Sequence, residues 1–241
     1  DAQFLWDSLL AEHEIGVADL PVSAEALDAR YGAGAWMPTP CFCHTQASGR
    51  KRRIDNAKRS GKNRLTRRSE RFTMTNALQP ALVLRLVYYI AFQIAPEVYR
   101  QITRMSFHSG GEDMPDAFRS IPTKRDHLPH TIVAAKNPIT QMVMFAQLYA
   151  ALFGYESAVY AFGRWSAFLE AAGRRIGQLL WSMYVDDGNL IDLAAAKGSG
   201  QGLIGKMFRL MGAELSAKKR HLMASIGEFL GLAHDLSTAM S

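Results

Sequence analysis

The stretch Leu179-Leu-Trp-Ser-Met-Tyr-Val-Asp-Asp-Gly-Asn-Leu-Ile191 decides the fold that this sequence predicts. Two apolar runs, 179–184 and 189–191, flank an Asp-Asp-Gly turn, which is typical of two short strands joined by a hairpin. Adjacent carboxylates at such a tip repel each other unless a cation is nearby. We therefore predict a hairpin with Asp186 and Asp187 at its tip. They could belong to an ordinary turn or to a metal site.

A second acidic cluster lies earlier, in Asp113-Met-Pro-Asp116-Ala117-Phe118. Asp116 is well placed to cap a short helical turn. Capping does not explain Asp113, whose carboxylate could turn toward the Asp186 pair if two strands pack side by side, and Mg²⁺ prefers such oxygen ligands. The preceding segment, 106–112, has few of the β-branched residues expected of a central strand.

Outside these clusters, apolar spacing predicts helices, and β-branched or apolar runs predict strands. The predicted helices are 4–14, a short helix capped by Ser23, two packed helices within 76–105 that break at Pro96, 157–176, and 203–211 ending at Gly212. The predicted strands are 41–44, a hairpin of 131–135 with 142–149, and two terminal strands at 222–226 and 228–233. Helices mixed with antiparallel strands indicate the α+β class.

The positive charge of the chain is concentrated in one block. The 241 residues are 48% apolar, enough for one large domain or two closely packed subdomains. Of the Lys and Arg residues, ten fall within 50–68 beside the single acid Asp55, although the whole chain carries only +6. Such a block suggests a site for phosphates, and a solvated or disordered loop is the alternative. We expect a mobile basic loop followed by irregular chain.

The two cysteines, Cys41 and Cys43, are too close in sequence to form a disulfide framework, which favours a reducing compartment. A zinc module built on Cys41-Phe-Cys43-His44 lacks a convincing second pair of ligands. His127 and His130 could be recruited, but their segment is more simply a polar turn.

The most apolar window, 81–96, is interrupted by Arg85 and Gln93 and is shorter than the roughly 20 residues that cross a bilayer. It therefore predicts a buried helix, and no membrane partner is expected. No secretory signal is visible, and the first residue is Asp rather than Met. We expect an intracellular fragment of a longer protein.

Several segments, taken in order, resemble the reverse transcriptase domain of retroelements. Tyr184-Val-Asp-Asp187 resembles the signature of that family, and Asp113-x-x-x-Ala117-Phe118 resembles its first carboxylate motif. Further similar segments are the fingers stretch Arg53-Ile-Asp-Asn56 with Ser60 and Asn63, the loop and helix 152–162, and the two palm-closing motifs 212–219 and 229–232. The resemblance spans approximately residues 41–236.

This resemblance implies an α+β polymerase right hand, with an antiparallel palm sheet and packed helices plus fingers. The implied division is an amino-terminal helical prelude at 1–40, a fingers-like region at 41–105 and a palm-like catalytic region at 106–241. A thumb, a ribonuclease H domain and an integrase are not visible. The oligomeric state is left open.

The resemblance also implies RNA-directed DNA synthesis by two-metal nucleotidyl transfer, with two Mg²⁺ or Mn²⁺ ions, deoxynucleoside triphosphates and a primed RNA or DNA template. Asp113 and Asp186 would hold both ions, and Asp187 would support the ions or the primer end. Nuclear localisation is implied by the family alone.

Other residues would contact nucleotide or template. Lys51 and Arg53 would grip the triphosphate or template phosphate, although the sequence does not choose among Lys51, Arg52 and Arg53. Lys219 would approach phosphates or be a surface lysine. Phe118 would lie beneath the sugar or in the core. The implied nucleotide contacts are Lys51, Arg53, Asp116, Ala117, Phe118, Phe153, Gly154 and Lys219, and the implied nucleic-acid contacts are Arg50, Arg52, Lys58, Arg59, Lys62 and Arg64.

A competing hypothesis is a catalytically inactive remnant that acts as a nucleic-acid-binding module. In that case the basic block would grip a duplex or a single strand, and the acids would be relics. Salt-sensitive binding is expected under both hypotheses, whereas metal-dependent primer extension is expected only of an enzyme.

Overall fold

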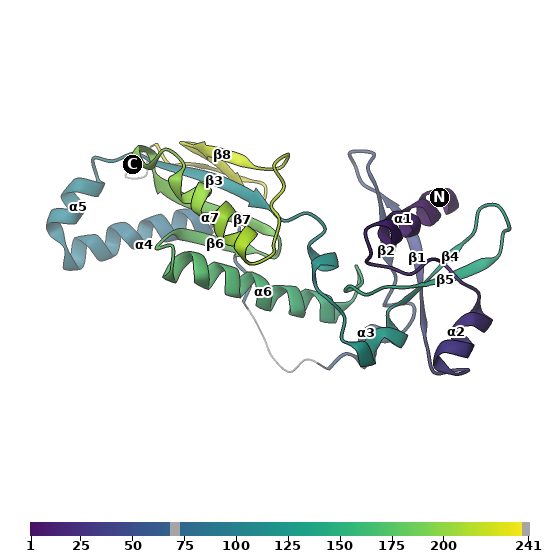
Figure 1. The fold of residues 1–241 in the computed structure, drawn as a ribbon. Helices are drawn as coiled ribbons and strands as arrows, with labels where there is room; N and C mark the ends of the chain where they lie inside the picture. Colours follow the sequence, from purple (N-terminus) through teal and green to yellow (C-terminus); the bar gives the residue numbers. More distant parts are fainter. Residues whose placement is uncertain (68–72, 238–241) are drawn as a thin grey trace. The chain divides into compact units, whose positions relative to one another are not determined.

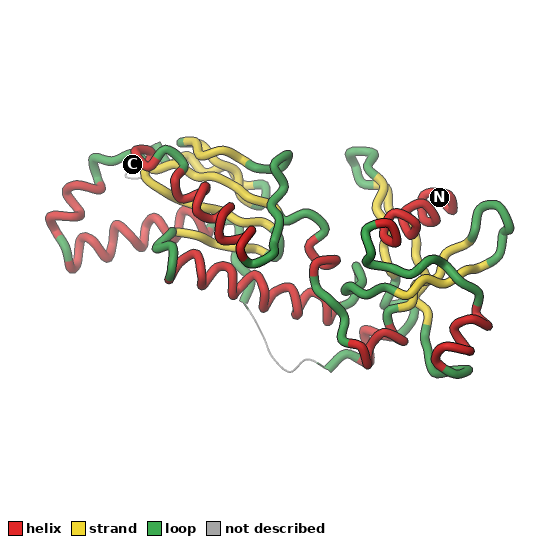
Figure 2. The backbone as a smooth tube through the Cα atoms, in the orientation of Figure 1, coloured by secondary structure: helices red, strands yellow, loops and turns green. Residues whose placement is uncertain are grey.

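The computed structural model describes residues 1–67 and 73–237, shown in Figures 1 and 2. The chain forms two compact units, Asp1–Arg71 with Asp116–Phe162 (unit 1) and Phe72–Pro115 with Gly163–Ser241 (unit 2). Because each unit is built from two separate segments, they differ from the contiguous division at residues 40 and 105. The assignment of fingers and palm stays a prediction.

Unit 1 surrounds a sheet of four strands in the order β2-β1-β4-β5. The β1–β4 pair is parallel, and the pairs at either side are antiparallel. Its elements are α1 (Ala2–Glu14), α2 (Ala24–Tyr31), β1 (Pro38–Thr45), β2 (Lys51–Asp55), α3 (Lys62–Leu65), two 3₁₀ turns (Ala117–Ser120 and Arg125–His130), β4 (Ile132–Lys136), β5 (Val143–Gln147) and the start of α6 (Glu156–Arg175).

The core of unit 1 joins α1 to this sheet. Leu9 on α1 is fully buried together with Val133, Leu148 and Leu152. The predicted 131–149 hairpin and the Ser23 cap, whose hydroxyl accepts from the Ala26 amide, are confirmed. The basic block is not wholly a loop, because its first part forms strand β2 against β1.

Unit 2 is built on a second sheet of four strands, β6-β7-β3-β8, in which every neighbouring pair is antiparallel. Its elements are α4 (Gln79–Ile94), α5 (Pro96–Ile102), β3 (Phe107–Asp113), the remainder of α6, β6 (Leu180–Tyr184), β7 (Asp187–Leu193), a 3₁₀ turn (Ala194–Ala196), α7 (Ser199–Leu210), β8 (His221–Ala224), β9 (Ile226–Phe229) and β10 (Leu232–Asp235). This combination of helices with largely antiparallel sheets is an α+β fold, as the sequence predicted.

The two faces of the unit 2 sheet are covered by different helices. On one face, Leu84 and Tyr88 of α4 pack against Phe107 of β3 and Ile191 of β7. On the other face, the fully buried Trp181 lies against the Phe208 ring of α7. The hairpin that carries the acidic motif is therefore held from both sides.

Three local predictions need correction. Tyr184 pairs directly with Asp187, so the hairpin loop is Val185–Asp186 rather than Asp-Asp-Gly. The carboxyl-terminal part of the described chain forms three short strands, β8, β9 and β10, rather than two. The central strand β3 covers Phe107–Asp113, most of the segment whose strand propensity is poor. The predicted break between helices at Pro96 is confirmed.

No helix within the described residues is long and apolar enough to span a lipid bilayer.

Gly188 has no room for a side chain, because a Cβ there would lie 2.0 Å from the indole of buried Trp181. We predict that Gly188→Ala lowers the free energy of unfolding by about 1–3 kcal/mol through overpacking, measured by chemical denaturation. The matched control is Gly202→Ala on α7, where a Cβ meets nothing within 4 Å. Equal stability of the two variants would contradict this packing argument.

Candidate active site

The pairing of β3 with β7 brings the predicted carboxylates together. In this antiparallel register Asp113 lies directly opposite Asp187. Residues directly opposite share one face of the sheet and have Cβ atoms roughly 4.5–5.5 Å apart. The Met114 amide donates to the Asp186 carbonyl oxygen at 3.1 Å, which ties the end of β3 to the hairpin loop. The register therefore brings Asp113 beside the adjacent pair Asp186 and Asp187, which lie far from it in the sequence.

The electrostatics of this cluster favour a positive partner. Partial burial, together with the charges of Asp186 and Asp113, raises the pKa of Asp187 to about 6, against the opposing influence of Lys219 and His221. A carboxyl group with a raised pKa is one whose ionised form is poorly stabilised. The site carries more negative charge than its protein surroundings neutralise.

Lys219 provides part of the missing positive charge. Its ammonium group lies 2.6 Å from Oδ1 and 2.9 Å from Oδ2 of Asp113. The Ser216 amide also donates to the Asp113 carbonyl oxygen, at 2.8 Å, so the loop before β8 is attached to β3 by backbone and side chain. The structure thus places Lys219 beside the acidic cluster and not on a remote surface.

The hairpin loop itself is strained. Val185 has φ +53°, a conformation in which a β-branched residue is a genuine outlier. The buried Ser166 hydroxyl of α6 donates to the Val185 carbonyl oxygen and holds it in place. Strain of this kind costs on the order of 1–3 kcal/mol and often marks a functional site.

A cavity of about 430 Å³ opens beside the carboxylates, within the size range of small-molecule sites. Its wall carries charges of both signs. Among its lining residues are Asp113, Asp187, Lys218, Lys219, His221 and Glu228. This arrangement suits a ligand that brings both metal ions and phosphate groups.

The donor set fits Mg²⁺ or Mn²⁺ in its chemistry, since carboxylate oxygens are the preferred ligands of these ions. The raised pKa of Asp187, which reflects the neighbouring negative charges as well as burial, is a second indication that a cation suits this site. In the arrangement described for residues 1–67 and 73–237, no three His, Cys, Asp or Glu side chains converge into a ready metal cluster. Binding would therefore require the side chains of Asp113, Asp186 and Asp187 to adjust.

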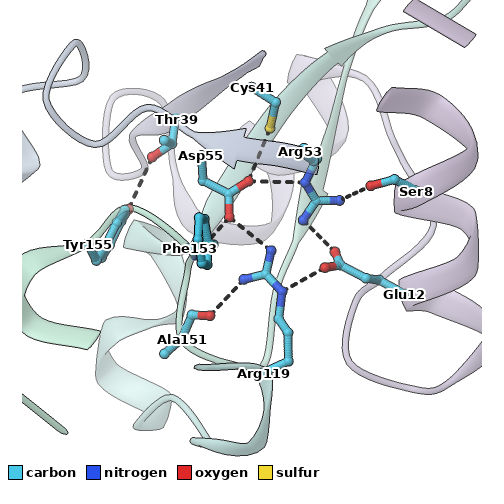
Figure 3. A network of polar contacts seen from close by, with 10 residues as sticks. All are labelled: Ser8, Glu12, Thr39, Cys41, Arg53, Asp55, Arg119, Ala151, Phe153 and Tyr155. Atoms are coloured by element: carbon cyan, nitrogen blue, oxygen red, sulfur yellow. Dashed lines mark hydrogen bonds and ion pairs between the residues drawn. The ribbon is translucent and has the colours of Figure 1, made fainter. Parts of the chain in front are cut away.

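In unit 1, the candidate Arg53 is enclosed in a buried network (Figure 3). Its guanidinium donates to Asp55 at 3.1 Å, to Glu12 at 2.6 Å and to Ser8 at 2.9 Å, and its side chain is 4% exposed. All these acceptors belong to the protein. Arg53 therefore serves the interior of unit 1, whereas Lys51 lies at the surface; the triphosphate contact stays a prediction.

Arg119, which was not among the predicted site residues, completes the same network. It donates to Glu12 at 2.6 Å, to Asp55 at 2.9 Å and to the Ala151 carbonyl oxygen at 2.7 Å. Burial opposes the charged form of Asp55, but the two arginines outweigh burial and lower its pKa. The Cys41 thiol also donates to Asp55, and burial raises the pKa of that thiol. Cys41 is thus a half-buried hydrogen-bond donor.

The basic block divides into buried and exposed members. The Lys62 ammonium donates to the Met37 and His130 carbonyl oxygens and to the Thr39 hydroxyl, and burial lowers its pKa to about 8. The donors of Lys62 are thus occupied inside unit 1, and its phosphate contact stays a prediction. The other predicted members lie at the surface or are half-buried: Arg50, Lys51, Arg52, Lys58, Arg59 and Arg64.

The remaining nucleotide candidates also lie in unit 1, and several have local packing roles. The Phe118 ring contacts the rings of Phe153 and Phe162. A Cβ on Gly154 would lie 2.2 Å from the Asp55 carbonyl oxygen, so this glycine permits a close approach within the chain itself.

Ala117 and Asp116 open the 3₁₀ turn that leads to Arg119. Ala117 is buried, whereas Asp116 occupies the cap position with φ +47°. Its carboxylate accepts no capping hydrogen bond within the described turn, so the predicted side-chain cap is not formed.

Sequence reasoning missed residues that act through contacts rather than motifs. Ser166 holds the strained loop, Arg119 completes the unit 1 network, and Arg220 pairs with Glu112 next to the catalytic candidate Asp113. None of the three lies within a motif of the family resemblance, although Arg119 and Arg220 each follow one directly. The available signal was limited to charged residues beside predicted strands.

A search against protein-family models and a search of curated protein sequences both found no match.

The raised pKa of Asp187 predicts a pH-dependent gain from removing its charge. Since the folded-state pKa is about 6 and the ordinary value 3.8, ionised Asp187 destabilises the fold above this window and not below it. Allowing for solvent screening, Asp187→Asn should raise the free energy of unfolding by on the order of 1 kcal/mol at neutral pH and by almost nothing near pH 4.

Denaturant titrations at both pH values measure this effect. Glu214→Gln, which removes an exposed acid from the same unit, is the control and should show little change at either pH. An Asp187→Asn gain that is equal at both pH values would exclude charge repulsion as its cause.

Proposed function

We propose that this chain is a reverse transcriptase-like nucleotidyltransferase that joins deoxynucleotides along a primed template. The observation that carries the proposal is the strand register that sets Asp113 opposite Asp187 at the hairpin loop containing Asp186. An antiparallel sheet bearing carboxylates at one edge, covered by helices, agrees with the palm expected from the family resemblance. The finer assignment of palm and fingers is part of this proposal.

In the proposed site Asp113, Asp186 and Asp187 would hold divalent metal ions. Such ions lower the pKa of an attacking hydroxyl and neutralise charge on the phosphate oxygens of the transferred and leaving groups. Catalysis then depends on positioning and charge, so a histidine or cysteine nucleophile is not required. The charge excess at Asp187 and the paired Lys219 agree with a site built for phosphates.

The protein groups have separate tasks. Ser166 and the Met114 amide fix the backbone of the loop that presents Asp186. Lys219 supplies one cation at the edge of the cluster. The cavity beside it offers space for the phosphate groups.

Primer extension on RNA and DNA templates with Mg²⁺ or Mn²⁺ tests the proposal. We expect extension by the parent chain and a loss of about 10²-fold or more in Asp186→Asn, since one preorganised electrostatic group is typically worth that much. Glu214→Gln is the matched control and should retain activity. Absence of extension by a parent chain shown to be folded would reject the enzyme hypothesis.

The second candidate function is that of a catalytically inactive nucleic-acid-binding module. It is favoured by the basic block in unit 1, most of whose cations lie at the surface, whereas Arg53 and Lys62 bond within the unit. Phosphate binding by such groups releases counterions and is sensitive to salt.

Replacing Lys58 and Arg59 with glutamine should weaken binding to a single-stranded oligonucleotide and reduce the slope of log affinity against log salt by roughly 1–2, because each phosphate contact contributes about 0.7. The control is Lys206→Gln with Arg209→Gln, which removes the same two kinds of charge from exposed positions on α7. Fluorescence anisotropy over a salt series measures both. Equal slopes in the two double variants would show that the basic block is not the binding surface.

A further inference from the structure

We propose that Glu112 and Arg220 form a positioning pair that holds Lys219 against Asp113. The inference rests on the proposed function for the importance of Asp113. The pairing itself rests only on contacts within unit 2.

Two charged pairs lie side by side at the end of the β3–β8 ladder. Gly111 pairs with His221. In the same register, the next residues along the two segments are Glu112 with Arg220 and Asp113 with Lys219, whose side chains are in contact. Arg220 Nε lies 2.8 Å from Glu112 Oε1, and Lys219 Nζ lies 2.6 Å from Asp113 Oδ1. Because successive residues of a strand point to opposite faces of the sheet, the two pairs lie on opposite faces at the end of β3.

A bulge decides which cation meets Asp113. The β3–β8 register shifts between Ser109, which pairs with Ala224, and Gly111, which pairs with His221. If the Ser109 register continued without the shift, Asp113 would lie opposite Arg220 and Glu112 opposite His221. The extra residue therefore gives Asp113 a lysine partner and gives Glu112 the arginine.

Close packing fixes the bulge. A Cβ on Gly110 would lie 2.5 Å from Met223 Sδ and 3.1 Å from the His221 carbonyl oxygen. The Gln201 amide of α7 donates to the His221 carbonyl oxygen at 2.9 Å and to the Gly111 carbonyl oxygen at 3.3 Å, which bridges the two strands. A register slip would break these contacts together.

The difference in burial identifies which pair constrains the other. The Glu112 side chain is 1% exposed, so losing Arg220 would leave a buried charge without its cation. The Lys219 side chain is 48% exposed. An ion pair that is so open to water restrains its partners only weakly. The buried Glu112 carboxylate therefore anchors the segment through the more exposed Arg220, and Lys219 is located by its covalent neighbour.

The experiment compares the reactivity of two adjacent lysines in the full chain. Lys219 and the exposed Lys218 are labelled with an amine-reactive reagent, and mass spectrometry gives their relative rates. In Glu112→Gln and in Arg220→Gln we expect labelling of Lys219 relative to Lys218 to rise about two- to five-fold, the size expected when a partly exposed ion pair is lost. Arg220→Lys retains the cation and should keep the parent ratio.

Two further variants keep the test decisive. Arg209→Gln removes an exposed arginine from the same unit and should leave the ratio unchanged. If a single variant fails to fold, Glu112→Gln with Arg220→Gln removes both charges without leaving one buried, and it should still show the increased ratio. An unchanged ratio in the folded variants that lack the pair would overturn the proposal.

Primer extension separates this result from the proposed function. If the parent chain extends primers, Arg220→Gln should lower kcat by about ten-fold with little change in the KM for primer and template, because the lost interaction acts on the chemical step. An unchanged kcat would overturn the catalytic relevance of the pair. A parent chain without extension would reject the proposed function, whereas the lysine ratio would still decide whether the pair positions Lys219.

Discussion

The arrangement of unit 2 depends on the central position of β3, which is hydrogen-bonded to β7 on one side and to β8 on the other. The β7 side sets Asp113 against Asp187, and the β8 side brings Lys219 and Arg220 to the same strand end. Antiparallel pairing has a side-chain period of two, so a slip of one residue on the β7 side would turn Asp187 to the wrong face, and a slip on the β8 side would change which cation meets Asp113. The site is thus a consequence of register.

Both units use burial to fix charged groups in place. In unit 1 the fully buried Asp55 is satisfied by Arg53 and Arg119, and Glu12 joins the two guanidinium groups (Figure 3). Breaking such a pair leaves an uncompensated buried charge, which is far more costly than losing a surface pair. This network connects α1, β2 and the segment around Arg119, and it occupies the Arg53 guanidinium inside unit 1.

The acidic cluster of unit 2 is held in a conformation that is unfavourable without a cation. Ionised Asp187 is opposed by partial burial and by two neighbouring acids, and the adjacent Val185 adopts a strained backbone conformation. Ser166 and the packing of Trp181 against Gly188 maintain this state. Stability given up at a site of this kind is consistent with catalytic use of the carboxylates, which is why the proposed function and the energetics support each other.

The sequence by itself determined the α+β class, most helices, the 131–149 hairpin and the hairpin that carries Asp186 and Asp187, because these follow from local periodicity and turn chemistry. Only the tertiary structure decided that Phe107–Asp113 is a central strand. Its glycines lower its strand propensity, but at Gly110 a glycine is required because β8 occupies the space that a Cβ would fill. The same holds for the burial of Arg53 and Lys62 and for the partners Arg119, Ser166 and Arg220. Local patterns show residue type and spacing, whereas strand register and burial depend on segments far apart in the chain.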